Sequence, residues 1–259
     1  MNSRYSSQKS KNQLFYRLSH GVNQAICFPY LGGYANTYQK LAEMLDCNVE
    51  LWAANPPGHG GSKAALVEDI DELIDNYASE VVRIMRPGCV FFGHSMGGTI
   101  AYFLAQRLTG MQSSGAVAPK AVIISACGAP SVFKNSRISR LPDRGLIDQL
   151  MSYGAMPKEV LDEPEFLKTL LPVFRADYRV LESAAHKDLP PLNIPTYLLW
   201  GQKDDAVPIS ALLQWTRYLK CRPIIWPIKG AEHMFIHSMV EEVARYVELS
   251  FDEMLLMSA

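Results

Sequence analysis

The 259-residue chain is 48% hydrophobic and 20% charged, a composition typical of globular proteins and unlike that of disordered or fibrous ones. Its 25 Lys and Arg residues nearly balance 26 Asp and Glu residues, so no strong field favours nucleic acid or an anionic membrane surface as a partner. The five cysteines are widely spaced and form neither a CxxC pair nor a metal-ligand cluster, which favours a reduced, cytoplasmic compartment.

The N-terminal residues 1–13 are polar and rich in Ser and Lys. They lack the apolar core that a secretion signal requires, and we expect them to form a loose tail. No segment approaches the roughly 18 consecutive apolar residues of a membrane span. We expect the remaining residues, 14–259, to form a single domain, active as a monomer.

Short apolar runs alternate with amphipathic segments along this domain. Buried strands are predicted at residues 25–28, 49–53, 89–92, 121–125, 196–200 and 223–226. Helices are predicted at residues 38–45, 70–85, 99–108, 209–218 and 239–254. This alternation predicts an α/β fold with a mostly parallel central sheet flanked by helices.

Residues 130–191 interrupt the alternation because they are rich in Pro and charge and contain no convincing buried strand. Short helices are predicted there at residues 144–153, 157–161 and 164–181, separated by Gly and Pro. We interpret the whole segment as a helical insertion that covers the sheet.

The strongest functional motif is the G-x-S-x-G sequence at residues 93–97, which follows a predicted strand and precedes a predicted helix. This context is that of the nucleophile elbow of α/β-hydrolases, in which a strained turn presents a serine at the end of a strand. Glycine at 93 and 97 removes the Cβ atoms that would clash in such a turn. The motif predicts that Ser95 is the nucleophile, against the plainer reading of a glycine-rich turn with a chance serine.

A serine hydroxyl needs a histidine base held by a carboxylate, and in this fold both follow the serine in the chain. His233 follows the last predicted strand, the expected place for the base. Asp204 and Asp205 both follow the preceding strand, within GQKDDAVP. We favour Asp204, because its spacing resembles the G-x-x-D-x-x-V-P turn of these hydrolases; Asp205 stays an alternative, as does a helix-capping role for the pair.

The other histidines fit the role of base less well. His59 precedes Ser95 in a Pro- and Gly-rich loop and is interpreted as a surface residue, and His94 adjoins the nucleophile, where the elbow points it away. The remaining three are expected to lie on the surface or to pack: His20, His186 and His237.

An oxyanion hole requires two backbone donors. One is expected from Met96, the residue after the nucleophile, and the other from the loop FPYLGG after the first core strand. We place the second donor at the N–H of Tyr30, with that of Leu31 as the alternative. The plainer reading of this loop is a glycine-rich turn.

Most of the chain resembles the external, type II thioesterases of nonribosomal peptide and polyketide synthesis. The similar segments are FPYLGGYANTYQKLAEML, PPGHG, GHSMGGTIAYFLAQRL, GAMPKEVLDEPEFLKTLLPVFRADYRVLES and WGQKDD. The pattern LPxxRADY at residues 171–178 is the most specific of them. The chain departs from the family at Leu31, where a small residue is usual, at His59, where Arg is usual, and around His233, where Gly-His-Phe is usual.

The resemblance implies hydrolysis of acyl or aminoacyl groups from the phosphopantetheine thiol of a carrier protein, releasing stalled or aberrant intermediates. It implies no cofactor or metal beyond the phosphopantetheine that the substrate carries. It also implies that the insertion forms a lid, whose Arg137, Arg140 and Arg144 are candidates for docking an acidic carrier protein. Candidate residues of the pocket or of the lid core are Met151, Tyr153, Met156, Phe166, Phe174 and Tyr178.

Two other functions stay open. The same triad would serve a carboxylesterase or lipase that cleaves free esters. A hydrolase-fold protein that binds a small molecule without turnover is the second, although the complete set of candidate groups argues against it.

Overall fold

The computed structural model describes residues 13–258 apart from residues 113, 114, 155 and 157. Of the expected tail, residues 1–12 therefore lie outside the described part of the chain. The described strands form one sheet in the spatial order β1-β3-β2-β4-β5-β6-β7, in which only β1 is antiparallel to its neighbour. The strands are β1 (Phe15–Arg17), β2 (Asn23–Phe28), β3 (Val49–Ala54), β4 (Val90–His94), β5 (Ala121–Ser125), β6 (Thr196–Gly201) and β7 (Ile224–Ile228).

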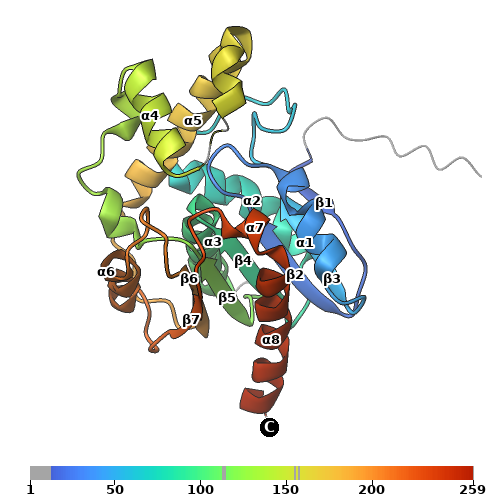
Figure 1. Ribbon diagram of the computed structural model, residues 1–259. Coiled ribbons are helices and arrows are strands. Elements are labelled where there is room, and N and C mark those ends of the chain that lie inside the picture. Colours follow the sequence, from blue (N-terminus) through green and yellow to red (C-terminus); the bar gives the residue numbers. More distant parts are fainter. Residues whose placement is uncertain (1–12, 113–114, 155, 157, 259) are drawn as a thin grey trace, which may run out of the picture.

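Helices cover both faces of this sheet (Figure 1). Alternate side chains of each central strand point to opposite faces, so that Ile26 and Phe28 of β2 join one core cluster and Ala25 and Cys27 join the other. Strands buried on both faces are continuously apolar, which explains why their positions are evident in the sequence.

The helices divide between the two faces. On one face lie α2 (Ile70–Ile84) and α3 (Met96–Gly110), and on the other lie α1 (Gln39–Met44) and α8 (Val240–Ser258). Asp69 caps the N-terminus of α2, because its carboxylate accepts hydrogen bonds from the N–H groups of Asp71 and Glu72. The remaining helical elements are η1 (Ala35–Tyr38), α6 (Ile209–Leu212), η6 (Leu213–Arg217) and α7 (Phe235–Ser238).

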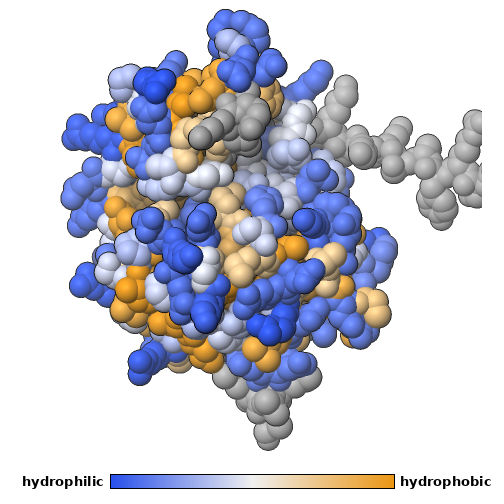
Figure 2. All heavy atoms as spheres, in the orientation of Figure 1, coloured by the Kyte–Doolittle hydropathy of each residue, from blue (hydrophilic) through white to orange (hydrophobic). Residues whose placement is uncertain are grey.

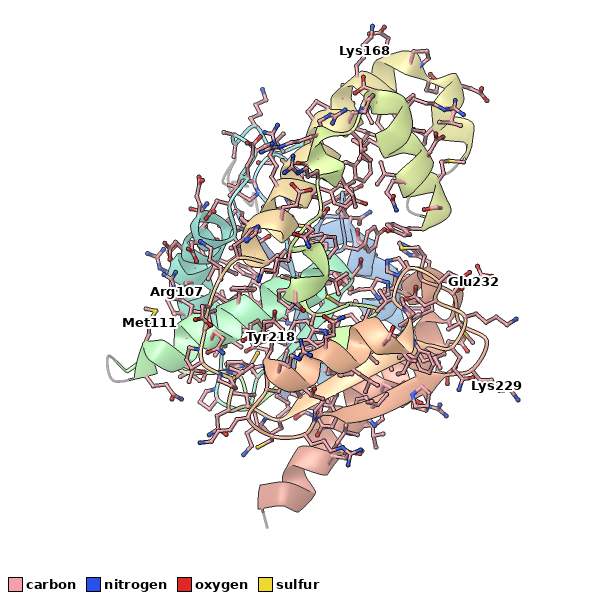
Figure 3. All side chains as sticks on the ribbon, turned by 90° about the vertical axis from the view of Figure 1, so that its left-hand side faces the viewer. Arg107, Met111, Lys168, Tyr218, Lys229 and Glu232 are labelled. Carbon is pink, nitrogen blue, oxygen red and sulfur yellow. The ribbon has the colours of Figure 1, made fainter. Side chains whose placement is uncertain are left out.

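Between β5 and β6 the described chain is helical, in agreement with the expected insertion. Its elements are η3 (Pro130–Phe133), η4 (Ile138–Arg140), α4 (Asp143–Ser152), η5 (Lys158–Asp162) and α5 (Pro164–Ala184). In Figures 1 and 3, α4 and α5 stand above the end of the sheet, and Lys168 marks the end of α5 that projects from the molecule. Figure 2 shows a cluster of hydrophobic residues on the surface of these helices, surrounded by hydrophilic residues.

The predicted fold class is confirmed. The observed ends of most strands and helices differ from the predicted ends by a few residues. The structure adds β1, a three-residue strand too short to produce a periodic pattern. The segment predicted as one helix at 209–218 consists of α6 and η6, and the last predicted helix is the longer α8 preceded by α7.

Candidate active site

The turn between β4 and α3 holds Ser95 in a strained conformation, with φ of 51° and ψ of −122°. Few residues other than glycine adopt positive φ. The turn is also sterically tight, because a Cβ added at Gly97 would lie 1.9 Å from the carbonyl oxygen of Phe28. Gly97 therefore allows the elbow to pack directly against the end of β2, while a Cβ at Gly93 would lie 1.9 Å from the carbonyl oxygen of Gly97, within the elbow itself.

A continuous chain of hydrogen bonds joins the three residues predicted to form the triad. The Ser95 Oγ lies 3.1 Å from Nε2 of His233, and Nδ1 of His233 lies 2.9 Å from Oδ2 of Asp204. Since a carboxylate only accepts, Nδ1 carries the proton and Nε2 is the acceptor for the serine hydroxyl. This is the arrangement in which a histidine can take a proton from serine.

The surroundings of Asp204 distinguish it from its neighbour. Its side chain is buried, and its second oxygen, Oδ1, accepts hydrogen bonds from the N–H groups of Ala206 and Val207. These bonds compensate the burial of a carboxylate and fix its orientation. Asp205 is exposed, so the structure places Asp204 and not Asp205 against His233.

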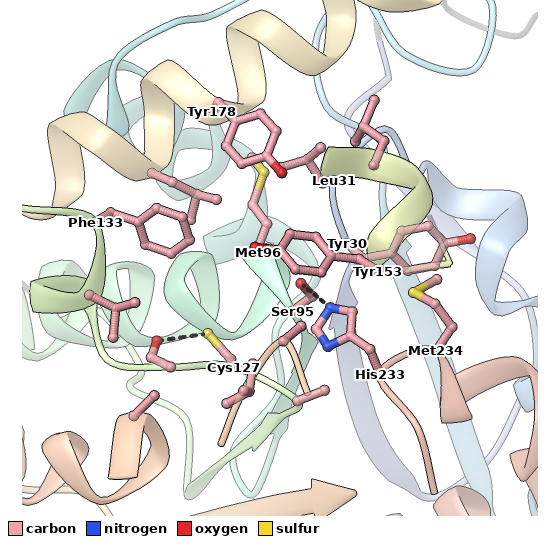
Figure 4. Close-up of a pocket in the computed structure, with 18 residues that line it drawn as sticks. Tyr30, Leu31, Ser95, Met96, Cys127, Phe133, Tyr153, Tyr178, His233 and Met234 are labelled. Carbon is pink, nitrogen blue, oxygen red and sulfur yellow. Dashed lines mark hydrogen bonds between the residues drawn. The ribbon is translucent and has the colours of Figure 1, made fainter. Parts of the chain in front are cut away.

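Ser95 lines a pocket of about 690 Å³, a volume that includes space open to solvent (Figure 4). The pocket contains no Asp, Glu, Lys or Arg among its described lining residues, which include Val132, Phe133, Leu181 and Ala211. It lies at the carboxyl ends of β2, β4, β5 and β6, where parallel sheets bind ligands. An apolar acyl chain fits this lining.

Cys127 is a second nucleophilic side chain in the pocket wall. Burial raises the pKa of its thiol to about 12, so the thiol stays neutral at physiological pH. Only a thiolate is a strong nucleophile, which leaves Ser95 as the better candidate.

The residues predicted to supply the oxyanion donors also line this pocket. Met96 is the first residue of α3, and the N–H groups of a first helical turn have no acceptor within the helix. Tyr30 and Leu31 lie in a turn closed by a 2.8 Å hydrogen bond from the Gly33 N–H to the Tyr30 carbonyl. The geometry thus brings both predicted donor segments to the serine without choosing between Tyr30 and Leu31.

His94 is fully buried below the triad and does not face the Ser95 hydroxyl. Its Nε2 lies 3.0 Å from the carbonyl oxygen of His233, and its Nδ1 lies 2.9 Å from Oγ of Ser125. Burial, reinforced by the neighbouring His233, places the pKa of His94 well below its ordinary value. The ring is therefore neutral, donating through Nε2 and accepting through Nδ1.

The interpretation of His59 as a surface residue is wrong. His59 is only 4% exposed, and its Nε2 lies 3.1 Å from Oδ2 of Asp177 on α5. The Pro- and Gly-rich loop sequence suggested exposure, but α5 covers this loop and supplies a buried carboxylate. Asp177 was missed as a site residue, and the sequence signal that could have found it is its place in the LPxxRADY pattern at residues 171–178.

The other histidines remain outside the triad. His20 and His186 are exposed. The Nε2 of His237 lies 2.8 Å from the hydroxyl of Tyr30, so His237 contacts the pocket wall from the exposed side. Burial lowers the pKa of His237.

The candidate lid residues separate into three groups. Tyr153 and Tyr178 line the pocket, and Tyr178 also belongs to the core. Met156 and Phe174 are buried in the core, and Met151 packs against it. Phe166 is 51% exposed and contributes to neither pocket nor core. The three candidate docking arginines, Arg137, Arg140 and Arg144, are exposed, and Arg144 pairs with Asp148.

Among the described residues, no group of three or more His, Cys, Asp or Glu side chains is placed to hold a metal ion. No helix within the described ranges has the length and apolar composition needed to cross a bilayer.

Comparison with known proteins gives concordant matches. A family model described as "Thioesterase domain" matches residues 23–250. Thioesterase PikA5 of Streptomyces venezuelae is 24% identical over 231 residues, covering 88% of this chain and 81% of its own. Thioesterase TesA of Mycobacterium leprae is 30% identical over 231 residues, covering 85% and 84%. The solved structure of BorB, a type II thioesterase from the borrelidin biosynthetic cluster, is 26% identical with a TM-score of 0.79, covering 92% and 97%.

Proposed function

Because this chain belongs to the thioesterase-domain family and is a thioester hydrolase, we propose that its substrates are acyl and aminoacyl groups carried on phosphopantetheine. The carrier would be a carrier protein of nonribosomal peptide or polyketide synthesis, and the role would be removal of stalled or aberrant intermediates. Similarity to the type II thioesterase BorB supports this substrate class, and the family match confirms the resemblance found in the sequence.

The observation that carries the proposed mechanism is the chain of hydrogen bonds from Ser95 through His233 to Asp204 at an apolar pocket. In this mechanism the Ser95 oxygen attacks the thioester carbonyl carbon while Nε2 of His233 takes the hydroxyl proton. The buried carboxylate of Asp204 then stabilises the imidazolium and keeps the ring oriented.

Attack converts the carbonyl oxygen into an oxyanion. We assign its stabilisation to the N–H of Met96 and to the N–H of Tyr30, with Leu31 as the alternative. Collapse of this tetrahedral intermediate breaks the carbon–sulfur bond and leaves the acyl group as an ester on Ser95. The departing phosphopantetheine thiolate receives the proton from His233. His233 next deprotonates a water molecule that attacks this ester, and a second collapse releases the carboxylic acid and restores Ser95. The proposed reaction needs protein groups and water only.

We also propose that residues 130–191 act as a lid within a single domain. The insertion contributes pocket residues from three separate elements, namely Val132 of η3, Leu150 of α4 and Tyr178 of α5. Movement of these elements would change both the size of the pocket and access to Ser95.

The test compares hydrolysis of an acetyl group on a holo carrier protein, acetyl-coenzyme A and a simple acetate ester, for the native protein and Ser95→Ala. Faster cleavage of the carrier-bound thioester, abolished in Ser95→Ala, supports the proposal. Preference for the simple ester indicates a carboxylesterase instead. Absence of both turnover and fluorophosphonate labelling of Ser95 indicates a binding protein without catalysis.

A further inference from the structure

A second buried pair of an acid and a histidine, Asp177 and His59, contacts the loop that contains Tyr30 and Leu31. The Oδ2 atom of Asp177, on α5, accepts a hydrogen bond of 2.7 Å from the N–H of Gly32. Gly32 follows Tyr30 and Leu31 directly, within the same turn. A carboxylate of the lid helix therefore bonds to the backbone that carries the proposed second oxyanion donor.

The same carboxylate oxygen contacts His59. Its Nε2 lies 3.1 Å from Asp177, while its Nδ1 lies 2.9 Å from the carbonyl oxygen of Pro57. A carbonyl and a carboxylate both only accept, so the two contacts are hydrogen bonds only when both ring nitrogens carry protons. The geometry thus describes an imidazolium and a carboxylate, each nearly excluded from solvent.

Packing restricts the loop further. Gly32 has φ of +74°, and a Cβ there would lie 2.4 Å from Cε1 of Phe174, which precedes Asp177 by one turn of α5. The helix therefore touches Gly32 twice, by an aromatic ring and by a charged hydrogen-bond acceptor. A bond to a charged acceptor is stronger and more directional than a neutral one.

We propose that Asp177 is a positioning residue for the loop that contains Tyr30 and Leu31, and that the imidazolium of His59 keeps the Asp177 carboxylate aimed at the Gly32 N–H. This inference rests on the proposed function in one respect, namely that the Tyr30–Leu31 segment supplies an oxyanion donor. It couples the lid to catalysis, because displacement of α5 withdraws the acceptor that holds this loop in place.

The electrostatics around His59 support this role. Burial lowers the pKa of His59, but the charge of Asp177 and the hydrogen bonds to Asp177 and Pro57 outweigh burial and raise it above the ordinary value. Tyr77 on α2 and Tyr178 on α5 also interact electrostatically with Asp177. Their pKa values are raised chiefly by burial, and the charge of Asp177 raises them further. Both tyrosines stay neutral near neutral pH, so His59 is the partner whose charge changes.

The experiment measures kcat and KM for an activated acetate ester, and the rate of Ser95 labelling by a fluorophosphonate, in the full-length protein. Both reactions use the oxyanion hole but need no carrier protein. The variants are Asp177→Ala, Asp177→Asn and His59→Gln. The control is Glu68→Gln, which removes the exposed ion pair between Glu68 and Arg179 of α5.

Asp177→Ala removes the acceptor that holds the Gly32 N–H, so the loop is expected to shift by a fraction of an ångström. We expect kcat to fall by roughly 10- to 100-fold, because oxyanion donors act only at short range, and KM to stay within about threefold of the native value. Asp177→Asn keeps an oxygen that accepts from Gly32, so it should recover part of kcat. Glu68→Gln should match the native enzyme. Native kcat should decline as the pH rises through the raised pKa of His59, and His59→Gln, whose amide does not titrate, should lack this decline.

A native kcat in Asp177→Ala, or a rise in KM alone, would overturn the proposal, because a purely structural role of the lid alters binding and not the chemical step. If Asp177→Ala does not fold, Asp177→Asn and His59→Gln decide: unchanged kcat with an unchanged pH profile in both overturns it. If the native protein shows no preference for the carrier-bound thioester but still cleaves the ester through Ser95, the proposed function is contradicted. The role of Asp177 is then decided by the ester kinetics of the variants alone.

Discussion

The imidazole of His94 hydrogen-bonds to the backbone carbonyl of His233, with 3.0 Å between Nε2 and the oxygen. The residue that precedes the nucleophile thus holds the main chain of the proposed base, and Ser125 at the end of β5 fixes the tautomer by donating to Nδ1. The elbow motif therefore supplies a support for the base as well as the nucleophile.

Replacing His94 with Phe should preserve ring volume but leave the His233 carbonyl and the Ser125 hydroxyl without their partner. Two unpaired buried polar groups cost about 1–3 kcal/mol each, so we expect a loss of at least about 2 kcal/mol in the free energy of unfolding. The freed His233 loop should lower kcat by about tenfold or more. Urea denaturation and ester hydrolysis measure the two effects. Ser125→Ala is the control, since it keeps the bond to His233, and equal losses in both variants would contradict this role.

The two buried histidines should act on stability at opposite ends of the pH range. Because the folded pKa of His94 is lowered, unfolding takes up a proton below about pH 6.5, and stability falls there by up to about 1.4 kcal/mol per pH unit. His59 has a raised pKa, so its contribution is complete below about pH 6.5 and is lost as pH rises through the folded value. Chemical denaturation across pH should show a flatter acidic arm for His94→Phe and a flatter alkaline arm for His59→Gln. Parallel curves for all three proteins would refute both assignments.

The sequence predicts the sheet well because its central strands are buried on both faces and are apolar throughout. It predicts less where structure depends on tertiary contacts. β1 is short and pairs with β3 only at the sheet edge, and the segment at 209–218 changes from α6 to η6 without a Gly or Pro to announce it. Local periodicity carries no information about such contacts.

The hydrogen-bonded arrangement of Ser95, His233 and Asp204 was predictable because a strained elbow requires glycines and because chain order in this fold limits the candidate acid and base. The pairing of His59 with Asp177 was not, since these residues are separated by 118 positions and meet only when α5 folds over the loop. A carboxylate in an amphipathic helix is most often solvated, so its burial cannot be deduced from spacing alone.

The elbow glycine at 97 should tolerate no side chain. In Gly97→Ala the new Cβ would lie 1.9 Å from a backbone oxygen of Phe28, so the backbone of the elbow or of the end of β2 would have to shift. We expect the variant to be unfolded or destabilised by more than about 4 kcal/mol. Gly110→Ala is the matched control in the same helix, because its Cβ meets nothing within 4 Å and alanine favours helix. Thermal unfolding of both proteins checks this contrast, which similar melting temperatures would contradict.

Charge reversal at Arg137 and Arg140 tests whether an acidic carrier protein docks beside the lid. Both side chains are exposed and line one surface hollow with Lys134, in which Glu182 is the single acidic lining residue described. We expect Arg137→Glu with Arg140→Glu to raise KM for the acyl-carrier thioester about tenfold and to weaken its salt dependence, with acetyl-coenzyme A kinetics unchanged. The control, Arg222→Glu, alters an exposed charge near the opposite end of the sheet. An equal effect of the control would show that net charge, and not docking, is measured.

The apolar pocket should discriminate against charged acyl groups. No described lining residue is Asp, Glu, Lys or Arg, and both oxygens of the adjacent Asp204 are already hydrogen-bonded. A carboxylate or ammonium on the acyl chain would therefore lose water without gaining an oppositely charged partner, at a cost of several kcal/mol. We expect kcat/KM for a butyryl group on a carrier protein to exceed that for malonyl by at least about tenfold, with KM carrying part of the difference.

Introducing a cation into the wall tests the cause of this selectivity. Val132 lines the pocket from η3 and is 44% exposed, so the stem of an arginine fits there while its guanidinium reaches an acyl carboxylate. Val132→Arg should raise malonyl hydrolysis and lower butyryl hydrolysis, whereas the uncharged Val132→Gln should lower both or neither. If Val132→Arg leaves the ratio unchanged, the selectivity does not originate in the charge of the pocket, and the shape of the lid must determine it.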